Sequence, residues 1–301
     1  MLFSDLIQRI KNTMAKIMKC IFPAAGLGTR FLPVTKEIAK EMLPLVNRPM
    51  ISYGVEEAVK SGCDDIVIIT GRTKRSIEDY FDCSFELENL LKTRGNMEQY
   101  EKIRSIASMA NFMYVRQPEP LGLGHAVLCG EPICRGEYFG VILPDDVIES
   151  ETPALQQLIS VHEKLGGSVI ALEEVPQANV SRYGIVDAEM VEDGIYRIND
   201  MIEKPSIHKA PSRLAIIGRY IISPRIFTIL SDIEAGIGGE LQLTDALRRL
   251  LQEEPMWGVV YKGERYDCGT QNGWFAANVK LAIKIPELRQ IIIDAASQNT
   301  L

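Results

Sequence analysis

Short, continuous runs of apolar residues recur along the first half of the chain, and helical patterns separate them. These runs predict buried strands, because a strand covered on both faces carries apolar side chains at successive positions. The predicted strands cover Lys19–Pro23, Ile66–Thr70, Phe112–Arg116, Phe139–Leu143 and Ser168–Leu172. Strands that alternate with helices are typical of βαβ units, so the pattern predicts an α/β fold with a mostly parallel sheet.

Apolar residues at intervals of three and four predict the helices. These cover Ile51–Lys60, Lys74–Phe81, Ala154–Leu165, Pro224–Leu230, Leu241–Gln252 and Gln271–Ile283, with a long helical pattern over Phe85–Met109 and a helix opening at Gly124–Leu128. After about residue 180 the pattern changes, and extended runs cover Gly184–Asp187, Tyr196–Glu203, Leu214–Ile222 and Trp257–Tyr261. No low-complexity linker interrupts the chain, so we predict one large α/β domain.

The first 18 residues differ from the rest. Their apolar positions have helical spacing, with Arg9, Lys11 and Lys16 among them. Two interpretations are open. The first is a short amphipathic helix that binds a membrane surface or a partner subunit. The second is an N-terminal extension without a fixed structure. We expect the second. The chain then divides into an extension (1–18), an α/β domain (19–284) and a C-terminal helical tail (285–301).

Composition excludes several classes of protein. The 301 residues include 33 Lys and Arg against 40 Asp and Glu, a net charge of −7. Such a chain is a poor general binder of nucleic acid, so any phosphate site must be local. The six cysteines form no C-x-x-C pair, which argues against a structural zinc site. No apolar run is long enough to span a bilayer, and scattered cysteines without a secretory leader lead us to expect a cytoplasmic protein.

A glycine-rich turn follows the first predicted strand, with the sequence Ala24-Ala25-Gly26-Leu27-Gly28-Thr29-Arg30. Its glycines let the backbone approach a ligand and offer N–H groups to phosphate, and Arg30 adds a cation that suits phosphate oxygens. The dinucleotide fingerprint G-x-G-x-x-G fails, because Phe31 stands at the third glycine. On its own, the loop is as typical of a plain turn as of a ligand site.

Charged residues follow this loop and the ends of later strands. Lys40 can return over the glycine loop, although most lysines are simply solvated. Asp145 and Asp146 follow a strand at the edge where open α/β sheets bind ligands, and Asp267 stands at a later strand end. Mg²⁺ uses one or two carboxylates plus substrate phosphates, whereas a loop aspartate can also merely cap a helix. Successive side chains in an extended segment point oppositely, so only one of Asp145 and Asp146 should face the site.

Glu203-Lys204-Pro205 ends another extended run. Glu203 could accept hydrogen bonds from sugar hydroxyls, and Lys204 could neutralise a sugar phosphate. The alternative is a surface ion pair before a turn.

Together these segments resemble the sugar-1-phosphate nucleotidylyltransferases, and among them the bacterial UTP–glucose-1-phosphate uridylyltransferases. The resemblance covers about residues 19–284. It rests on ten ordered segments: AAGLGTRFLPVTK (24–36), KEMLPLVNRP (40–49), FDCSFELE (81–88), VRQPEPLGLGHAVLC (115–129), VILPDD (141–146), YGIVD (183–187), EKP (203–205), LAIIGRYIIS (214–223), ELQLTDAL (240–247) and YDCGT (266–270). FELE and GLGHAVLC favour uridylyltransferases over thymidylyl and adenylyl relatives.

The resemblance implies a Rossmann-like nucleotidyltransferase fold, in which helices flank a mixed, mostly parallel sheet, and a homodimer or homotetramer. It implies transfer of a uridylyl group from UTP to α-D-glucose 1-phosphate, giving UDP-glucose and pyrophosphate, with Mg²⁺ as cofactor and no covalent intermediate. It also implies roles for individual residues. These are nucleotide binding by Ala25, Gly26, Gly28, Thr29, Gln117 and Gly122, sugar binding by Gly184, Glu203 and Lys204, metal binding by Asp145 and Asp267, and catalysis by Arg30, Lys40 and Lys204.

Attack by a phosphate oxygen needs no general base, so we interpret His125 as a structural residue at a helix start. Three alternatives stay open. The first is a different substrate pair, such as dTTP or galactose 1-phosphate. The second is a regulatory subunit that binds UDP-sugars without turnover, which intact Lys40 and Asp145 disfavour. The third is an NAD oxidoreductase, which the missing third glycine disfavours.

Overall fold

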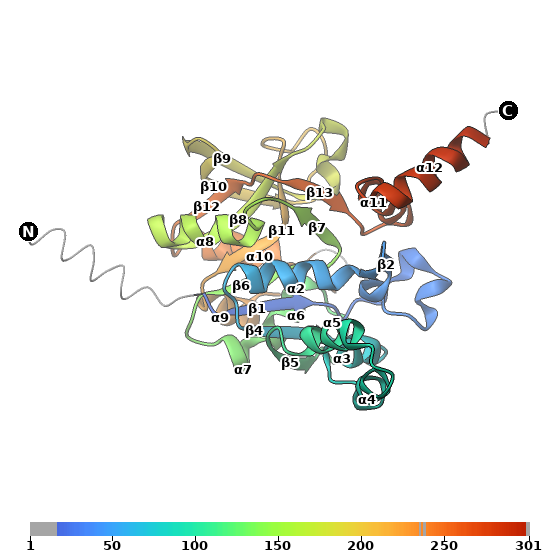
Figure 1. Cartoon of the computed structure of the whole chain (residues 1–301). Helices are drawn as coiled ribbons and strands as arrows, with labels where there is room; N and C mark the ends of the chain where they lie inside the picture. Colours follow the sequence, from blue (N-terminus) through green and yellow to red (C-terminus); the bar gives the residue numbers. More distant parts are fainter. Residues whose placement is uncertain (1–16, 235, 237–238, 299–301) are drawn as a thin grey trace, which may run out of the picture.

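A nine-stranded sheet forms the centre of the part of the chain that the structure describes, which comprises residues 17–234, 236 and 239–298. The computed structural model gives the strand order β5-β4-β1-β6-β11-β8-β12-β10-β9 (Figure 1). The strands are β1 (Lys19–Pro23), β4 (Asp65–Thr70), β5 (Asn111–Arg116), β6 (Phe139–Ile142), β8 (Ser168–Glu174), β9 (Gly184–Glu192), β10 (Ile195–Glu203), β11 (Leu214–Ile222) and β12 (Met256–Val260). The predicted α/β class is confirmed.

The sheet is mixed, as expected, but the prediction that it is mostly parallel was wrong, because its antiparallel strand pairs in the described chain are no fewer than its parallel ones. Strands β5, β4, β1 and β6 pair in parallel, and β8 pairs in parallel with β12. Strands β11 and β10 run against their neighbours, so the later half of the sheet contains antiparallel pairs. This change corresponds to the extended runs after residue 180, where long helices no longer separate the strands.

Two hydrophobic cores cover the two faces of the sheet. Successive residues of β4 alternate between them, because neighbouring side chains in a strand point to opposite faces: Ile66 and Ile68 join one core, and Val67 and Ile69 join the other. The first core packs against α2 (Met50–Lys60), α3 (Arg75–Phe81) and α8 (Ala154–Leu165). The second packs against α6 (Leu123–Cys129), α7 (Glu131–Cys134), α9 (Arg225–Asp232) and α10 (Leu243–Leu250).

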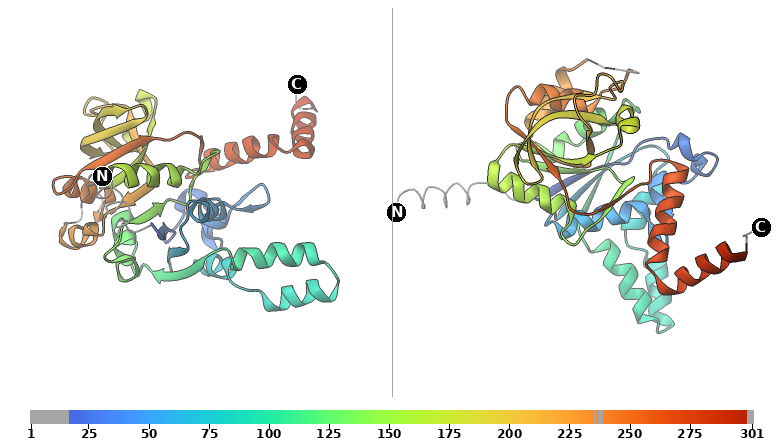
Figure 2. Two further views of the ribbon diagram at one scale, coloured as in Figure 1. Left: turned by 60° about the vertical axis from the view of Figure 1, so that its left-hand side comes forward. Right: turned by 90° about the horizontal axis from the view of Figure 1, so that it is seen from above.

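The prediction of one long helical stretch over Phe85–Met109 was wrong. The segment folds into two helices, α4 (Phe85–Thr93) and α5 (Met97–Ala107). Gly95 between them has a φ of 70°, which ends the first helix in the left-handed conformation that glycine favours. The Asn96 side chain then accepts a hydrogen bond from the Gln99 N–H at 3.3 Å and caps the second helix. The pair forms a hairpin that projects from the body (Figure 2).

Short elements shape the edge of the sheet near the first strand. Two small antiparallel ladders join β2 (Pro44–Leu45) to β3 (Arg48–Pro49), and β7 (Asp146–Glu149) to β13 (Glu264–Asp267). Single 3-10 turns cover Thr29–Phe31, Val34–Lys36 and Lys40–Met42, with a longer one at Gln177–Arg182. Strand β7 was not predicted, since four residues carry too little pattern, whereas β13 ends at Asp267, which was expected at a strand end. They bring the segment of Asp267 beside that of Asp146.

Helices α11 (Gln271–Ile283) and α12 (Pro286–Gln298) end the described chain, and α12 extends away from the body (Figures 1 and 2). None of the α12 residues is buried. The amphipathic pattern of the first 18 residues falls almost wholly on residues 1–16, outside the described residues. Where the structure describes the chain, it contains no helix with the length and apolar character needed to cross a membrane.

Candidate active site

The loops after β1 and β6 meet at the carboxyl end of these parallel strands. β1 leads into the glycine loop, and β6 ends shortly before Asp145. The loops border a cavity of about 470 Å³. Its lining includes the predicted site residues Ala25, Gly26, Gly28, Thr29, Lys40, Gln117, Gly122 and Asp145. The structure therefore gathers the predicted nucleotide-binding set around one space.

A left-handed residue shapes the glycine loop. Gly28 has a φ of 68°, which glycine adopts without a steric penalty. A Cβ at Gly28 would lie 3.1 Å from Thr35 Cγ2, and the Thr35 hydroxyl donates to the Gly28 carbonyl at 2.7 Å. At Gly26 a Cβ would meet no atom within 4 Å. The loop is thus held by Thr35 and leaves room for a ligand beside its backbone.

Lys40 and Asp145 form an ion pair on the cavity wall. Lys40 Nζ lies 2.6 Å from Asp145 Oδ2. Burial alone lowers the pKa of Lys40, but the charges of Asp145 and Glu41 outweigh it and hold this pKa above its usual value. Burial alone raises the pKa of Asp145, and Lys40 reverses that effect, so the pKa of this carboxyl lies below its usual value. Both groups are charged at neutral pH.

A second ion pair, between Glu41 and Lys74, is buried next to Lys40. The Glu41 side chain is fully buried, and its Oε2 accepts a hydrogen bond from Lys74 Nζ at 2.8 Å. Its other oxygen lies 4.0 Å from Lys40 Nζ and has no hydrogen-bond partner among the described residues. Burial raises the pKa of Glu41, although Lys40 and Lys74 counteract it. Lys74 was not predicted as a site residue, because no pattern in the sequence signals that a lysine will be buried.

Gln117 and Gly122 lie together in the same cavity lining. The Gln117 side chain donates to the Gly122 carbonyl at 3.2 Å, and its amide nitrogen is 3.0 Å from His125 Nδ1. Gly122 has a φ of 97°, and a Cβ there would lie 2.8 Å from Glu240 Cβ. A larger residue at 122 would therefore both strain the backbone and push the Glu240 segment away.

A second cavity, of about 360 Å³, shares Leu143 and Asp145 with the first. Its lining includes the predicted residues Arg30, Asp145, Lys204 and Asp267. Arg182 and Arg265 add two further cations to this lining, and neither was predicted. Basic side chains of this number suit an anionic ligand.

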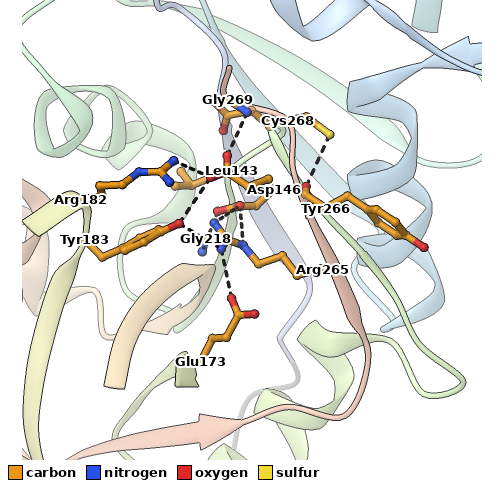
Figure 3. Close-up of polar contacts among 12 residues, drawn as sticks. Leu143, Asp146, Glu173, Arg182, Tyr183, Gly218, Arg265, Tyr266, Cys268 and Gly269 are labelled. Atoms are coloured by element: carbon orange, nitrogen blue, oxygen red, sulfur yellow. Dashed lines mark hydrogen bonds and ion pairs between the residues drawn. The ribbon is translucent and has the colours of Figure 1, made fainter. Parts of the chain in front are cut away.

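Asp267 is held in this second cavity by its neighbours. Arg182 Nη2 lies 3.1 Å from Asp267 Oδ2, and the Tyr183 hydroxyl lies 3.4 Å from the same oxygen. The Gly269 N–H donates to Asp267 Oδ1 at 3.1 Å. In Figure 3, Arg182 and Tyr183 lie on the left and Gly269 lies at the top.

The two predicted metal ligands flank Gly269. A Cβ on Gly269 would lie 3.2 Å from Asp267 Oδ1 and 3.6 Å from Asp145 Oδ2, and the Cys268 N–H donates to the Asp145 carbonyl at 2.8 Å. Two carboxylates on one cavity fit Mg²⁺, which needs few protein ligands when phosphates complete its shell. Within the described ranges no cluster of three or more His, Cys, Asp and Glu side chains is arranged for a metal. The residues therefore suit a metal shared with substrate rather than a complete protein cage.

The carboxylate of Asp146, next to Asp145 in sequence, is held by an arginine. Arg265 binds its carboxylate at 2.5 Å and also reaches Glu173 at 3.0 Å, so the guanidinium bridges two acids (Figure 3). Burial raises the pKa of Asp146, although Arg265 counteracts it. Asp145 instead pairs with Lys40. Both aspartates nevertheless belong to the lining of the second cavity, so the prediction that only one of them would face the site was wrong.

A fully buried arginine fixes the turn that carries both aspartates. Arg219 on β11 donates to the backbone carbonyls of Leu143 and Asp146, at 3.4 Å and 2.7 Å. Its guanidinium also forms two hydrogen bonds, of 2.9 Å and 2.8 Å, with the Glu57 carboxylate of α2. Arg219 was not predicted as a site residue, because it stands in an apolar run within the LAIIGRYIIS segment (214–223) and nothing in the sequence shows which acid it pairs with.

Gly184 and Glu203, the predicted sugar-binding residues, are paired across β9 and β10. A Cβ on Gly184 would lie 3.2 Å from Glu203 Oε2, and the Thr244 hydroxyl donates to that oxygen at 2.7 Å. Lys204 Nζ is 2.9 Å from Glu203 Oε1. Lys204 lines the second cavity, whereas Gly184 and Glu203 lie beside Tyr183 and outside the lining as described.

Comparison with known proteins agrees with this geometry. The model of the nucleotidyl transferase family matches residues 19–283. The chain belongs to the nucleotidyl transferase family. Within it, the chain groups with the bacterial UTP–glucose-1-phosphate uridylyltransferases, as the motifs predict. It is 49% identical over 278 residues to such a protein of Bacillus subtilis, YngB, covering 92% of this chain and 94% of the relative. A relative of the same name in Staphylococcus epidermidis is 46% identical, with coverage of 92% and 96%.

Solved structures of this nucleotidyl transferase family superpose on the chain. A UDP-glucose pyrophosphorylase complexed with UDP-glucose has a TM-score of 0.82 at 48% identity, over 89% of this chain and 99% of that structure. A UTP-bound enzyme of Acinetobacter baumannii has a TM-score of 0.86 at 35% identity, over 94% and 100%. The chain is thus an enzyme of the nucleotidyltransferase class.

Proposed function

We propose that the protein transfers the uridylyl group of UTP to α-D-glucose 1-phosphate, releasing pyrophosphate and forming UDP-glucose. One observation carries this proposal: two cavities meet at Asp145, one bordered by the glycine loop and the other by basic side chains. Two adjoining sites suit a reaction between two phosphate-bearing substrates. The relatives named above, one bound to UTP and one to UDP-glucose, support the choice of substrates.

In the first cavity, we propose that Ala25, Gly26, Gly28 and Thr29 hold the triphosphate. The open space at Gly26 supports close approach of a phosphate to the backbone. Gln117 and Gly122 would bind the uracil, since they line the same cavity. Because both amide protons of Gln117 have protein acceptors, its oxygen is left to accept a hydrogen bond from the base.

In the second cavity, we propose that Lys204 binds the phosphate of glucose 1-phosphate. Gly184 and Glu203, which lie beside Tyr183 and outside the lining of this cavity, would contact the sugar hydroxyls. The absence of a side chain at Gly184 supports this, because a Cβ there would crowd the Glu203 carboxylate. Thr244 joins this set as a residue that orients Glu203 through its hydroxyl.

Asp145 and Asp267 would hold Mg²⁺, consistent with their positions on either side of Gly269. When bound, the ion supplies positive charge that orients and neutralises substrate phosphates. In the structure, Lys40 forms an ion pair with Asp145 at 2.6 Å, and Arg182 forms one with Asp267 at 3.1 Å. Both cations would therefore be available to phosphate oxygens once the carboxylates take another partner.

The reaction would proceed by in-line attack of the sugar phosphate oxygen on the α-phosphorus of UTP, with pyrophosphate leaving and no covalent intermediate. The attacking oxygen carries no proton at neutral pH, so no general base is needed. Repulsion between the anions is the barrier, and Arg30, Lys40 and Lys204 would lower it by positioning and neutralising them. The protonated state of Lys40, favoured by Asp145 and Glu41, supports this role.

We also propose that the enzyme acts as a homodimer or homotetramer. The exposure of Ile291 (63%) and Ile293 (50%) on α12 supports an assembly that would cover them. Light scattering should give a mass of two or four times the 33.6 kDa of one chain. A mass of one chain would rule the assembly out.

The decisive experiment measures pyrophosphate release by the purified protein with Mg²⁺, glucose 1-phosphate and UTP. Parallel reactions contain dTTP, CTP, ATP or GTP, and a second series replaces glucose 1-phosphate by galactose 1-phosphate. We expect rapid release only with UTP and glucose 1-phosphate. Release with another pair would replace the substrate assignment. Binding of UDP-glucose without release in any reaction would instead indicate a regulatory protein.

A further inference from the structure

The side chain of Gln117 has two partners behind the first cavity. Gln117 is only 7% exposed, and its Nε2 lies 3.2 Å from the Gly122 carbonyl and 3.0 Å from His125 Nδ1. Gln117 and Gly122 line the cavity, whereas His125 does not belong to the lining among the described residues. His125 therefore touches the residue that would read the base, without reaching the base itself.

These contacts fix the orientation of the amide. A backbone carbonyl only accepts hydrogen bonds, so the group that faces Gly122 must be the amide nitrogen. If the amide were flipped, two oxygens would face each other at that distance. The same nitrogen then donates its second proton to His125, so Nδ1 must be the unprotonated ring nitrogen. Both amide protons are thus used, and Oε1 is the one group of the amide that remains for a ligand.

We propose that His125 is a positioning residue that locks the Gln117 amide with its oxygen toward the nucleobase, and so selects uracil over cytosine. The inference rests on the function proposed above and names the source of its base preference. Uracil carries a proton on N3, which an amide oxygen can accept. Cytosine has a lone pair at N3, which an amide oxygen repels.

The backbones of both partners are anchored independently of this contact. The Gln117 N–H donates to the Thr70 carbonyl of β4 at 2.9 Å, and the Gly124 N–H of α6 donates to the Leu241 carbonyl at 2.8 Å. Removing the ring acceptor should therefore free the amide without unfolding the strand end or the helix. The Gly122 contact alone would hold one amide proton and allow the side chain to turn.

The experiment compares two substitutions at one position. His125→Asn can place an amide oxygen where Nδ1 lies and so retain the acceptor, whereas His125→Phe retains a ring and removes it. Calorimetric titration would give the Kd of UTP and of CTP for each protein, without sugar phosphate and therefore without turnover. We expect His125→Phe to reduce the preference for UTP over CTP by about fivefold, the effect of losing one hydrogen bond, and His125→Asn to retain it within about twofold.

A second background tests whether His125 acts through Gln117. In a Gln117→Ala protein, the further change His125→Phe should alter the UTP-to-CTP preference by less than about twofold, because the residue it positions is gone. The inference is overturned if His125→Phe leaves the preference unchanged, if His125→Asn is as impaired as His125→Phe, or if the effect persists in the Gln117→Ala background. Failure of the native protein to bind either nucleotide would overturn it as well.

These binding results are separable from the proposed reaction. If the native protein binds UTP in preference to CTP and loses that preference in His125→Phe, the inference stands even when no pyrophosphate is released. If pyrophosphate is released from UTP but the variants keep the native preference, the proposed function stands and the role of His125 is refuted.

Discussion

Lys40 and Asp145 are 105 residues apart in sequence and 2.6 Å apart in the structure. The sequence singles out each residue separately, by a lysine that follows a glycine loop and an aspartate that follows a strand. Only the fold shows that the two charges hold each other, with Glu41 and Lys74 buried behind them. This pairing keeps the lysine protonated and the carboxylate ionised, which is the state that phosphate and metal binding require.

At this scale we predict the effect of Asp145→Asn. The amide removes the charge that pairs with Lys40 and would bind Mg²⁺, so turnover should fall by at least about a hundredfold while the fold is kept. Pyrophosphate release measures turnover, and circular dichroism measures the fold. Asp193→Asn in the exposed turn between β9 and β10 is the matched control and should retain activity. Near-normal turnover of Asp145→Asn would mean that another group holds the metal.

At the scale of elements, a charged cluster joins β13, β7 and α11. Glu264 accepts a hydrogen bond from the Tyr266 hydroxyl at 2.8 Å and pairs with Lys280 and Lys284 at 3.2 Å each. Lys284 also binds Glu149 of β7 at 2.5 Å. Tyr266, Lys280 and Lys284 lower the pKa of Glu264 from an ordinary 4.5 to about 2. The cluster therefore connects the short ladder that carries Asp267 to the helix that follows it.

This shift predicts a pH dependence of stability. A carboxyl whose pKa is lower in the folded state stabilises the fold above its unfolded pKa, and that contribution is lost as the pH falls toward the folded value. Glu264→Gln should therefore lower the urea midpoint most at neutral pH, and the difference from the native protein should shrink as the pH falls from about 4.5 to about 2. A difference that stays constant over this range would show that Glu264 does not titrate as expected.

At the scale of the whole molecule, the Arg219–Glu57 pair ties the two aspartates to the core. It connects β11, α2 and the turn after β6, and Arg219 is completely buried. Such a pair is a weak source of net stability, since both charges lose their water. Replacing Arg219, however, leaves the Glu57 carboxylate buried with only the Leu155 N–H as a hydrogen-bond donor among the described residues, at 3.0 Å, and without a counter-ion.

We predict that Arg219→Met lowers the free energy of unfolding by about 3–5 kcal/mol, because Glu57 would remain buried without its partner. The double variant Glu57→Met with Arg219→Met should recover much of this loss. Urea unfolding measures both. As a control, Lys164→Ala breaks the exposed Lys164–Glu192 pair and should cost at most about 1 kcal/mol. An equally small loss for Arg219→Met would show that water reaches Glu57.

The sequence by itself determined most strands and helices of this protein, because buried strands and amphipathic helices have periods that a single chain displays. It also located the glycine loop, Lys40, Asp145 and Asp267, since each follows a strand or turn with a recognisable pattern. It failed at Phe85–Met109, where one left-handed glycine outweighs a continuous helical pattern.

Only the tertiary structure decided which of these residues meet. Lys74, Arg219 and Arg265 are ordinary basic residues in sequence, and their roles come from burial beside acids on other elements. The β7–β13 ladder, which brings the Asp267 segment beside the turn of Asp145, consists of strands too short to show a period. The orientation of Gln117 likewise depends on a carbonyl and a ring nitrogen supplied by the fold. The physical reason is that periodicity records burial along a chain, whereas pairing of charges and hydrogen-bond partners is a property of neighbours in space.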